Sequence, residues 1–189
     1  MILFFDTETT GLPNNWKAAV TDIDNWPRLV QIAWKSFDDD GIEINSKDYI
    51  IKPEGFLIPM EASNVHGITT ELALVKGKDL IEILSELNVE IDKARTLVAH
   101  NMNFDSKVIG AEMVRKKISS NLFSKQLVCT MESSTNYCRI PGNYGFKWPR
   151  LSELHIKLFG EDFHEAHNAS KDIQVTAKCF WELKKLGKI

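Results

Sequence analysis

Short apolar runs rich in β-branched and aromatic residues predict three strands in the N-terminal part of the chain. They are Ile2–Phe5, Leu29–Trp34 and a segment around Asp48–Ile51. Between the second and third runs, Asp38–Gly41 is typical of a hairpin turn. Three consecutive strands of this kind predict an antiparallel meander.

Hydrophobic residues then recur at helical spacing, and helices alternate with further strands. In the clearest helix, one stripe is formed by Leu80, Ile83, Leu84, Leu87 and Ile91. The predicted helices are Thr70–Ala73, Leu80–Ile91, Phe104–Lys117 with Asn101 or Asn103 as its cap, Ser152–Phe159 and Ala169–Leu186. The further strands are Thr96–His100 and Leu127–Cys129. This order predicts an α/β fold, with a mixed five-stranded sheet flanked by helices.

Composition places the chain among ordinary globular proteins. Its 189 residues are 43% hydrophobic and 26% charged, and no linker or repeat divides them, so residues 1–189 are expected to form one domain. The formal charge of −3 argues against a broad basic surface for long nucleic acid. A small site in which metal ions, instead of lysines, meet a phosphate is compatible with this charge.

The distribution of apolar residues and cysteines bears on the compartment. The apolar N-terminal stretch is too short for a signal peptide, and no segment approaches the roughly 18 apolar residues that span a bilayer. Cys129, Cys138 and Cys179 are odd in number and lack the spacing of a zinc site. These features favour a soluble, intracellular protein of the cytoplasm that does not engage a membrane.

Asp6 and Glu8 are the first candidates for chemistry. Residues i and i+2 of a strand point to the same face, so the two carboxylates should converge. Like charges repel at short range, and burying them without compensation is costly. A positive group is therefore expected between them.

Two further segments pair a histidine with an aspartate. His100 ends a predicted strand and Asp105 begins the next helix, so both are expected at the carboxyl end of that strand, where open α/β sheets bind ligands. His167 is placed in the loop before the last helix, because five helical residues rotate by about 500° and would separate it from Asp172. Asp172 itself adjoins the apolar stripe of that helix.

These side chains together suit phosphodiester hydrolysis. The four carboxylates supply the oxygen ligands that Mg²⁺ and Mn²⁺ prefer. Two ions about 3.5–4 Å apart clamp the attacking and leaving oxygens of a phosphoryl displacement. A neutral histidine such as His167 can take the proton of the attacking water. The set indicates a phosphodiesterase with two divalent metal ions as cofactors.

Three motifs carry a resemblance to a known family. Asp-Thr-Glu-Thr-Thr-Gly-Leu from Asp6, His-Asn-x-x-Phe-Asp from His100 and His-x-x-x-x-Asp from His167 resemble the motifs of DnaQ-like 3′–5′ exonucleases in order and spacing. The histidine five residues before Asp172 is similar to that of the DEDDh subclass. Val65–Thr69 also resembles a stretch common in proofreading members.

The resemblance implies a ribonuclease H-like fold and a role for each motif residue. Asp6 would bridge both metals, and Glu8 and Asp172 would complete the inner site. Asp105 would hold the second ion, and His167 would be the general base. The substrate contacts that the resemblance implies are Thr9, Gly11, Leu12, His66, Asn101 and Phe104.

The activity implied is release of 5′-mononucleotides from a free 3′ end. His66–Thr69 favours single-stranded DNA and a proofreading or repair role. An exoribonuclease of the RNase T or oligoribonuclease type stays open, because nothing in the sequence places a contact to the 2′-hydroxyl. A non-catalytic module docked on a polymerase is disfavoured, since all four carboxylates are kept. The implied partner is a DNA or RNA 3′ end, with room for a DNA polymerase or another replication or repair protein.

Some residues also have structural interpretations. His100 is better explained as a hydrogen-bonded structural histidine. For Asn101, a role as a helix cap alone is an alternative to substrate contact. The segment Lys147–Arg150 combines basic residues with Trp148. Either Trp148 packs against the protein and the charges are exposed, or the segment holds a single strand by phosphate contact and base stacking. The Gly11–Pro27 loop and the Ser133–Pro149 region are long relative to short members of the family, so substrate-contacting positions are not transferred to the additional residues.

Overall fold

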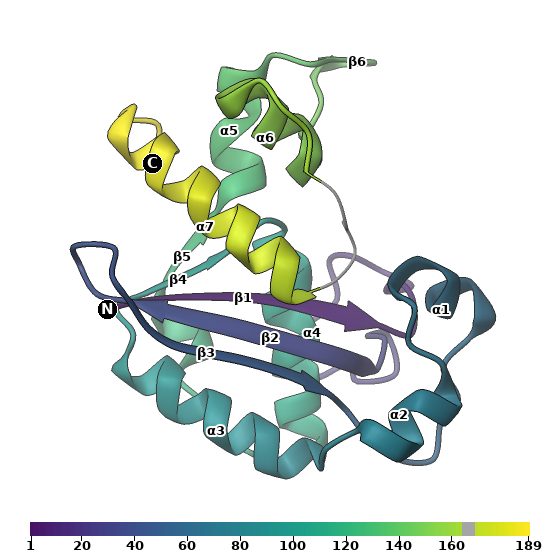
Figure 1. Ribbon diagram of the computed structural model, residues 1–189. Coiled ribbons are helices and arrows are strands. Elements are labelled where there is room, and N and C mark those ends of the chain that lie inside the picture. The colour runs from purple at the N-terminus through teal and green to yellow at the C-terminus, as the bar shows by residue number, and fades with distance from the viewer. Residues whose placement is uncertain (164–168) are drawn as a thin grey trace.

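Five strands form one mixed sheet in the computed structural model, which describes residues 1–163 and 169–189 (Figure 1). They are β1 (Ile2–Thr9), β2 (Leu29–Phe37), β3 (Glu43–Ile50), β4 (Thr96–Ala99) and β5 (Gln126–Cys129). Their order across the sheet is β3-β2-β1-β4-β5. The first three pair antiparallel, whereas β4 is parallel to β1 and β5 to β4. The predicted meander and mixed sheet are confirmed.

Helices cover both faces of this sheet. Those in the described ranges are α1 (Met60–His66), α2 (Thr70–Lys76), α3 (Leu80–Lys93), α4 (Met102–Arg115), α5 (Thr130–Cys138), α6 (Leu151–Phe159) and α7 (Ala169–Lys185), with a 3₁₀ turn at Leu122–Ser124. Figure 1 shows α7 across the near face and α4 behind the sheet. None of these helices combines the length and apolarity needed to cross a bilayer.

The alternation of β1 decides which residues face which layer. Ile2 and Phe4 pack with Phe180 and its neighbours on α7. Leu3 and Phe5 lie in the larger core cluster on the other face, which includes the buried stripe of α3 and the apolar residues of α4. Because successive strand residues point to opposite faces, the polar end of β1 follows the same rule. Its carboxylates turn toward α7, and the threonine between them turns toward α4.

Among the elements that differ from the prediction, three bury little apolar surface. The third strand begins at Glu43 and not near Asp48, because this edge strand has no fully buried residue and so no clear alternation. The seven-residue α1 also has no buried residue, and its signals are Pro59 at the start and Gly67, with φ of 76°, at the end. Helix α5 is mostly polar, so no apolar stripe reveals it.

The region 133–149 therefore contains regular structure. It includes the end of α5 and a small hairpin of β6 (Pro141–Gly142) and β7 (Gly145–Phe146). α5 and α6 pack against α7 through a separate cluster around Cys138, Leu154 and Leu183. The hairpin projects from this subassembly, and the segment after β7 leads back toward the start of α6 (Figure 1).

Candidate active site

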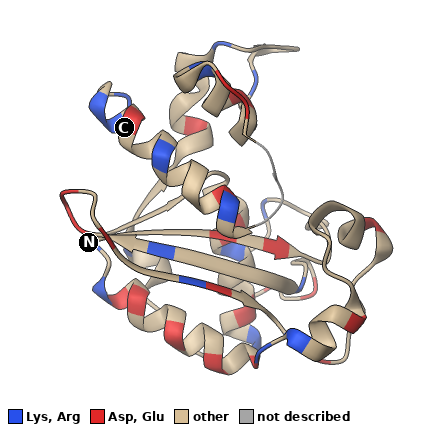
Figure 2. Ribbon diagram, in the orientation of Figure 1, with Lys and Arg blue, Asp and Glu red and all other residues tan. Residues whose placement is uncertain are grey.

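The carboxylates of β1 lie where the strand outruns its parallel neighbour. The pairing of β1 with β4 ends at Phe4, which lies opposite Val98, whereas its pairing with β2 continues to Thr9. Asp6 and Glu8 thus lie beyond the carboxyl end of β4, next to the start of α4. Figure 2 shows acidic positions on β1 at the place where α7 crosses it. This edge is the usual ligand-binding side of an open α/β sheet.

Three carboxylates converge at this position. Oxygen atoms of Asp6, Glu8 and Asp172 all lie within 4.8 Å of one another. Asp172 comes from the first turn of α7 and precedes the buried Ile173, whose packing against the sheet fixes the helix there. The fold thus brings Asp172 next to two residues that precede it by at least 164 positions in the chain.

Asp105 approaches from the opposite face of the sheet. It is only 3% exposed and lies in the first turn of α4. Its Oδ1 accepts hydrogen bonds from the backbone N–H of Thr7, at 3.1 Å, and from the Thr7 hydroxyl, at 2.8 Å. Thr7 therefore holds this carboxylate beside the cluster, a role that the sequence analysis did not assign.

Burial and mutual repulsion raise the pKa values of the clustered carboxylates. Burial, followed by repulsion from Asp105, Asp172 and Glu8, raises the pKa of Asp6 well above its ordinary value. Burial and the charges of Asp172 and Asp105 raise the pKa of Glu8 to about 8. Burial also raises the pKa of Asp105 to about 7, although the two bonds from Thr7 oppose it. A bound cation would reverse these shifts, as expected from the sequence.

A pocket of about 390 Å³ opens beside the carboxylates. Five of the six predicted substrate contacts line it, namely Thr9, Gly11, Leu12, His66 and Phe104. The sixth, Asn101, instead lines a neighbouring cavity. It occupies the N-cap position of α4, as predicted, although its side chain makes no cap hydrogen bond.

The turn after β1 shapes this pocket. The Thr9 hydroxyl donates to the Gly11 carbonyl at 2.7 Å, and Gly11 has φ of 151°, which L side chains rarely adopt. The turn leaves Leu12 72% exposed. It is tied to β2, since the N–H of Thr10 donates to the Arg28 carbonyl and the N–H of Arg28 donates to the Thr10 hydroxyl.

His66 enters the pocket from the end of α1. Its Nδ1 accepts a hydrogen bond from the N–H of Ile68 at 3.1 Å, so the neutral ring carries its proton on Nε2. Burial lowers its pKa, with the Thr9 carbonyl partly opposing this shift. His66 is therefore a neutral donor at pH 7.

His100 is a structural residue, as the sequence favoured. Its Nε2–H donates to the Pro149 carbonyl at 3.0 Å, and its Nδ1 accepts from the Thr130 hydroxyl at 3.0 Å. Burial lowers its pKa to about 4, so it stays neutral. His167, the predicted general base, lies outside the described residues, as does His164.

A buried ion-pair network joins α4 to the start of β2 and was also missed. Glu112 of α4 is fully buried and accepts hydrogen bonds from Arg28 Nε, at 2.8 Å, and from the N–H of Leu29, at 3.0 Å. Arg115 Nη1 lies 3.1 Å from the same carboxylate oxygen. A glutamate within an apolar helix face was the sequence signal for this network. Arg115 is only three residues away, but the other two partners, Arg28 and Leu29, are more than 80 residues away in the chain.

Comparison with known proteins agrees with this geometry. The exonuclease family model (RNase_T) matches residues 3–180. The DNA polymerase III subunit epsilon of Treponema pallidum is 32% identical over 176 residues, which cover 93% of this chain and 73% of that protein. The DNA polymerase III PolC-type of Listeria monocytogenes is 30% identical over 189 residues, which cover 97% of this chain but 11% of that protein.

A solved structure shares the fold. Exonuclease I of E. coli in complex with a dA16 oligonucleotide matches with a TM-score of 0.75 and 19% identity, covering 97% of this chain and 40% of that one. The fold prediction of a ribonuclease H-like sheet is thereby confirmed. The chain belongs to the exonuclease family, as its three motifs of the DnaQ-like 3′–5′ exonucleases indicated.

Proposed function

We propose that this chain hydrolyses nucleotides from the 3′ end of single-stranded DNA, releasing 5′-mononucleotides, with residues 1–189 acting as one domain. The observation that carries the proposal is the convergence of Asp6, Glu8 and Asp172 beside a pocket lined by Leu12 and His66. A pocket for a terminal nucleotide next to a cation site is the minimum that an exonuclease requires.

The carboxylates fit two divalent ions, Mg²⁺ or Mn²⁺. All donors are oxygen atoms, which hard cations prefer, and their mutual repulsion disappears when a cation binds. Asp6, Glu8 and Asp172 would hold the inner ion, and Asp6 and Asp105 the second. When bound, such ions stabilise charge on the phosphate and acidify the attacking water.

The chain's own residues would position the substrate. Leu12, presented by the Gly11 turn, would separate the last two bases, while Phe104 and Thr9 would contact the terminal nucleotide. His66, which lines the same pocket, would contact the substrate there. His167 would take the proton of the attacking water as general base.

The choice of DNA, and of a polymerase as partner, is supported by the relatives. Two of them are DNA polymerase III proteins, and exonuclease I is seen with a DNA oligonucleotide. The chain spans only 40% of exonuclease I and 11% of the PolC-type protein. As parts of the proposal, this chain binds the 3′ end of single-stranded DNA and associates with a DNA polymerase.

The test is digestion of matched DNA and RNA oligonucleotides labelled at their 5′ ends, with Mg²⁺, Mn²⁺ or EDTA. We expect a metal-dependent ladder that shortens DNA from the 3′ end. Asp6→Ala should abolish it, whereas Asp40→Ala, an exposed turn carboxylate, should not. If only RNA is cleaved, the chain is an exoribonuclease and the proposed DNA substrate is wrong. Binding without cleavage would leave a non-catalytic module.

A further inference from the structure

Two exposed tryptophans line a cleft beside the active site. Trp16, from the β1–β2 loop, is 42% exposed, and Trp148, between β7 and α6, is 62% exposed. Together with Asn101, Asn103, Met131 and Glu132 they enclose about 470 Å³. Large aromatic side chains that stay exposed around a hollow are typical of a binding surface.

Trp16 is held in place by its loop. The Lys107 ammonium donates to the Trp16 carbonyl at 3.0 Å. Next to it, the Asn15 N–H donates to Asn25 Oδ1 at 2.7 Å, and Asn25 Nδ2 donates back to the Asn15 carbonyl at 3.0 Å. Because these hydrogen bonds restrain the loop, the tryptophan can bind with little loss of conformational entropy.

Trp148 is held in place by its neighbours in sequence. The Pro149 carbonyl accepts the Nε2–H of His100, a histidine that has no other assigned role. On the other side, the Lys147 ammonium donates to Glu153 at 2.6 Å. The ring therefore projects into the cleft from a segment fixed at both ends.

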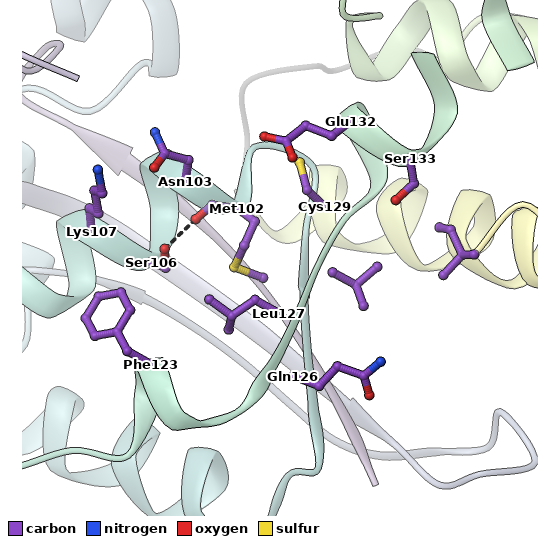
Figure 3. Close-up of a pocket in the computed structure, with 12 residues that line it drawn as sticks. Met102, Asn103, Ser106, Lys107, Phe123, Gln126, Leu127, Cys129, Glu132 and Ser133 are labelled. Atoms are coloured by element: carbon purple, nitrogen blue, oxygen red, sulfur yellow. Dashed lines mark hydrogen bonds between the residues drawn. The ribbon is translucent and has the colours of Figure 1, made fainter. Parts of the chain in front are cut away.

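The cleft continues from the pocket for the terminal nucleotide. The rings of Trp16 and Phe104 lie 5.8 Å apart, and Phe104 also lines the pocket with Leu12 and His66. On its far side the cleft borders a larger cavity between α4 and β5, shown in Figure 3 with Asn103 and Glu132 at its rim. A strand that leaves the active site along Phe104 would meet the tryptophans next.

We propose that this cleft stacks the base of an unpaired nucleotide upstream of the 3′ end against Trp16 and Trp148; this inference rests on the proposed exonuclease function. A base suits the cleft because every base offers a π-face to an aromatic ring and polar edges to Asn101, Asn103 and Glu132. The carboxylate of Glu132 would keep the phosphate backbone outside. Because a base within a duplex is already stacked on its neighbours, the cleft selects single strands.

The experiment compares substrates that do and do not reach the cleft. The nitrophenyl ester of thymidine 5′-monophosphate occupies only the terminal pocket, whereas single-stranded DNA of two to eight nucleotides extends progressively toward the tryptophans. We expect Trp148→Ala and Trp16→Ala each to lower kcat/KM for the longer DNA about tenfold and to leave hydrolysis of the ester unchanged. Trp148→Phe should retain the wild-type rate.

A modified substrate adds a second readout. For the wild-type enzyme, an abasic residue at the upstream position should lower kcat/KM as much as the Trp148→Ala substitution does on intact DNA. For the Trp148→Ala variant, the abasic residue should lower kcat/KM no further. Tyr144→Ala, which removes a fully exposed aromatic from the β6–β7 turn, is the matched control and should match wild type.

The outcomes separate this proposal from the proposed function. If wild-type protein hydrolyses neither the ester nor DNA, the exonuclease function is wrong. If it hydrolyses both, but the tryptophan variants match wild type at every length or lose equal activity on the ester, the stacking site is overturned. Unchanged hydrolysis of DNA by the variants, with weakened binding of a polymerase, would assign the cleft to a protein partner instead.

Discussion

Single side chains set the geometry of the carboxylate cluster, and Thr7 is the clearest case. Its hydroxyl and N–H both donate to Asp105. Thr7→Val keeps the shape but removes the hydroxyl donor, so we expect kcat to fall about tenfold, the typical effect of losing a hydrogen bond to a charged group. Thr7→Ser should restore activity. Rates at several Mg²⁺ concentrations would check this; a shift in Tm with unchanged kcat would contradict the positioning role.

His167 is the second residue whose effect can be predicted. From the proposed role of His167 as general base, we expect His167→Ala to cost about 10²–10⁴ in rate. Metal affinity should be unchanged, since the substitution removes a proton acceptor and no carboxylate ligand. Single-turnover rates together with calorimetric titration of Mn²⁺ would measure both. The control is His164→Ala, and an equal loss of rate in that variant would show that the wrong histidine was chosen.

The sequence was sufficient for residues whose role depends on local spacing. Asp6 and Glu8 share a face because strands alternate, and the structure places Asp172 with them. Thr7 was overlooked, because its partner is 98 residues away and no local pattern reveals that pairing. Trp148 was left between two interpretations, since whether a side chain is exposed depends on how the whole fold packs around it.

At the scale of elements, a buried carboxylate joins α4 to the start of β2. Glu112→Ala would leave Arg115 and Arg28 without their shared acceptor, so we expect a loss of about 3–5 kcal/mol in the free energy of unfolding. Urea denaturation would measure it. Glu54→Ala removes a more exposed partner of Lys116 and serves as the control, with only a small change expected. Equal effects in the two variants would contradict the structural role of Glu112.

Elements were predictable in proportion to how much apolar surface they bury. The stripe of α3 is fully buried and its helix was identified within two residues of its observed end. α1 buries nothing, so it shows no periodicity, although its Pro59 and Gly67 flanks are a usable signal. α5 buries mostly small polar residues such as Thr130 and Ser134, which give no hydrophobic stripe.

For the whole molecule, the carboxylate cluster links stability to pH and metal. The pKa values of Glu8, about 8, and Asp105, about 7, exceed their ordinary values of 4.5 and 3.8. Between about pH 4 and pH 8 the native protein therefore binds more protons than the unfolded chain, and the free energy of unfolding falls as pH rises. We expect Tm in EDTA to decrease across this range.

Divalent ions should reverse that decrease. On the proposed metal site, Mg²⁺ or Mn²⁺ would bind the ionised carboxylates of the native state, so the rise in Tm on adding metal should be larger at pH 8 than at pH 5. Asp6→Ala should flatten the pH dependence in EDTA and raise Tm at pH 8, because it removes one member of the repelling group. A metal-free Tm that rises toward pH 8 would contradict the assigned cluster.

The early end of β4 has a spectroscopic consequence. Beyond Phe4, β1 has no parallel neighbour among the described residues, and the Thr7 amide donates to the Asp105 side chain where a strand carbonyl would otherwise lie. Its hydrogen-exchange rate and ¹⁵N chemical shift therefore depend on the state of one carboxylate. In an NMR titration with Mg²⁺ or acid, this amide would serve as an intrinsic reporter of the occupancy and protonation of the site.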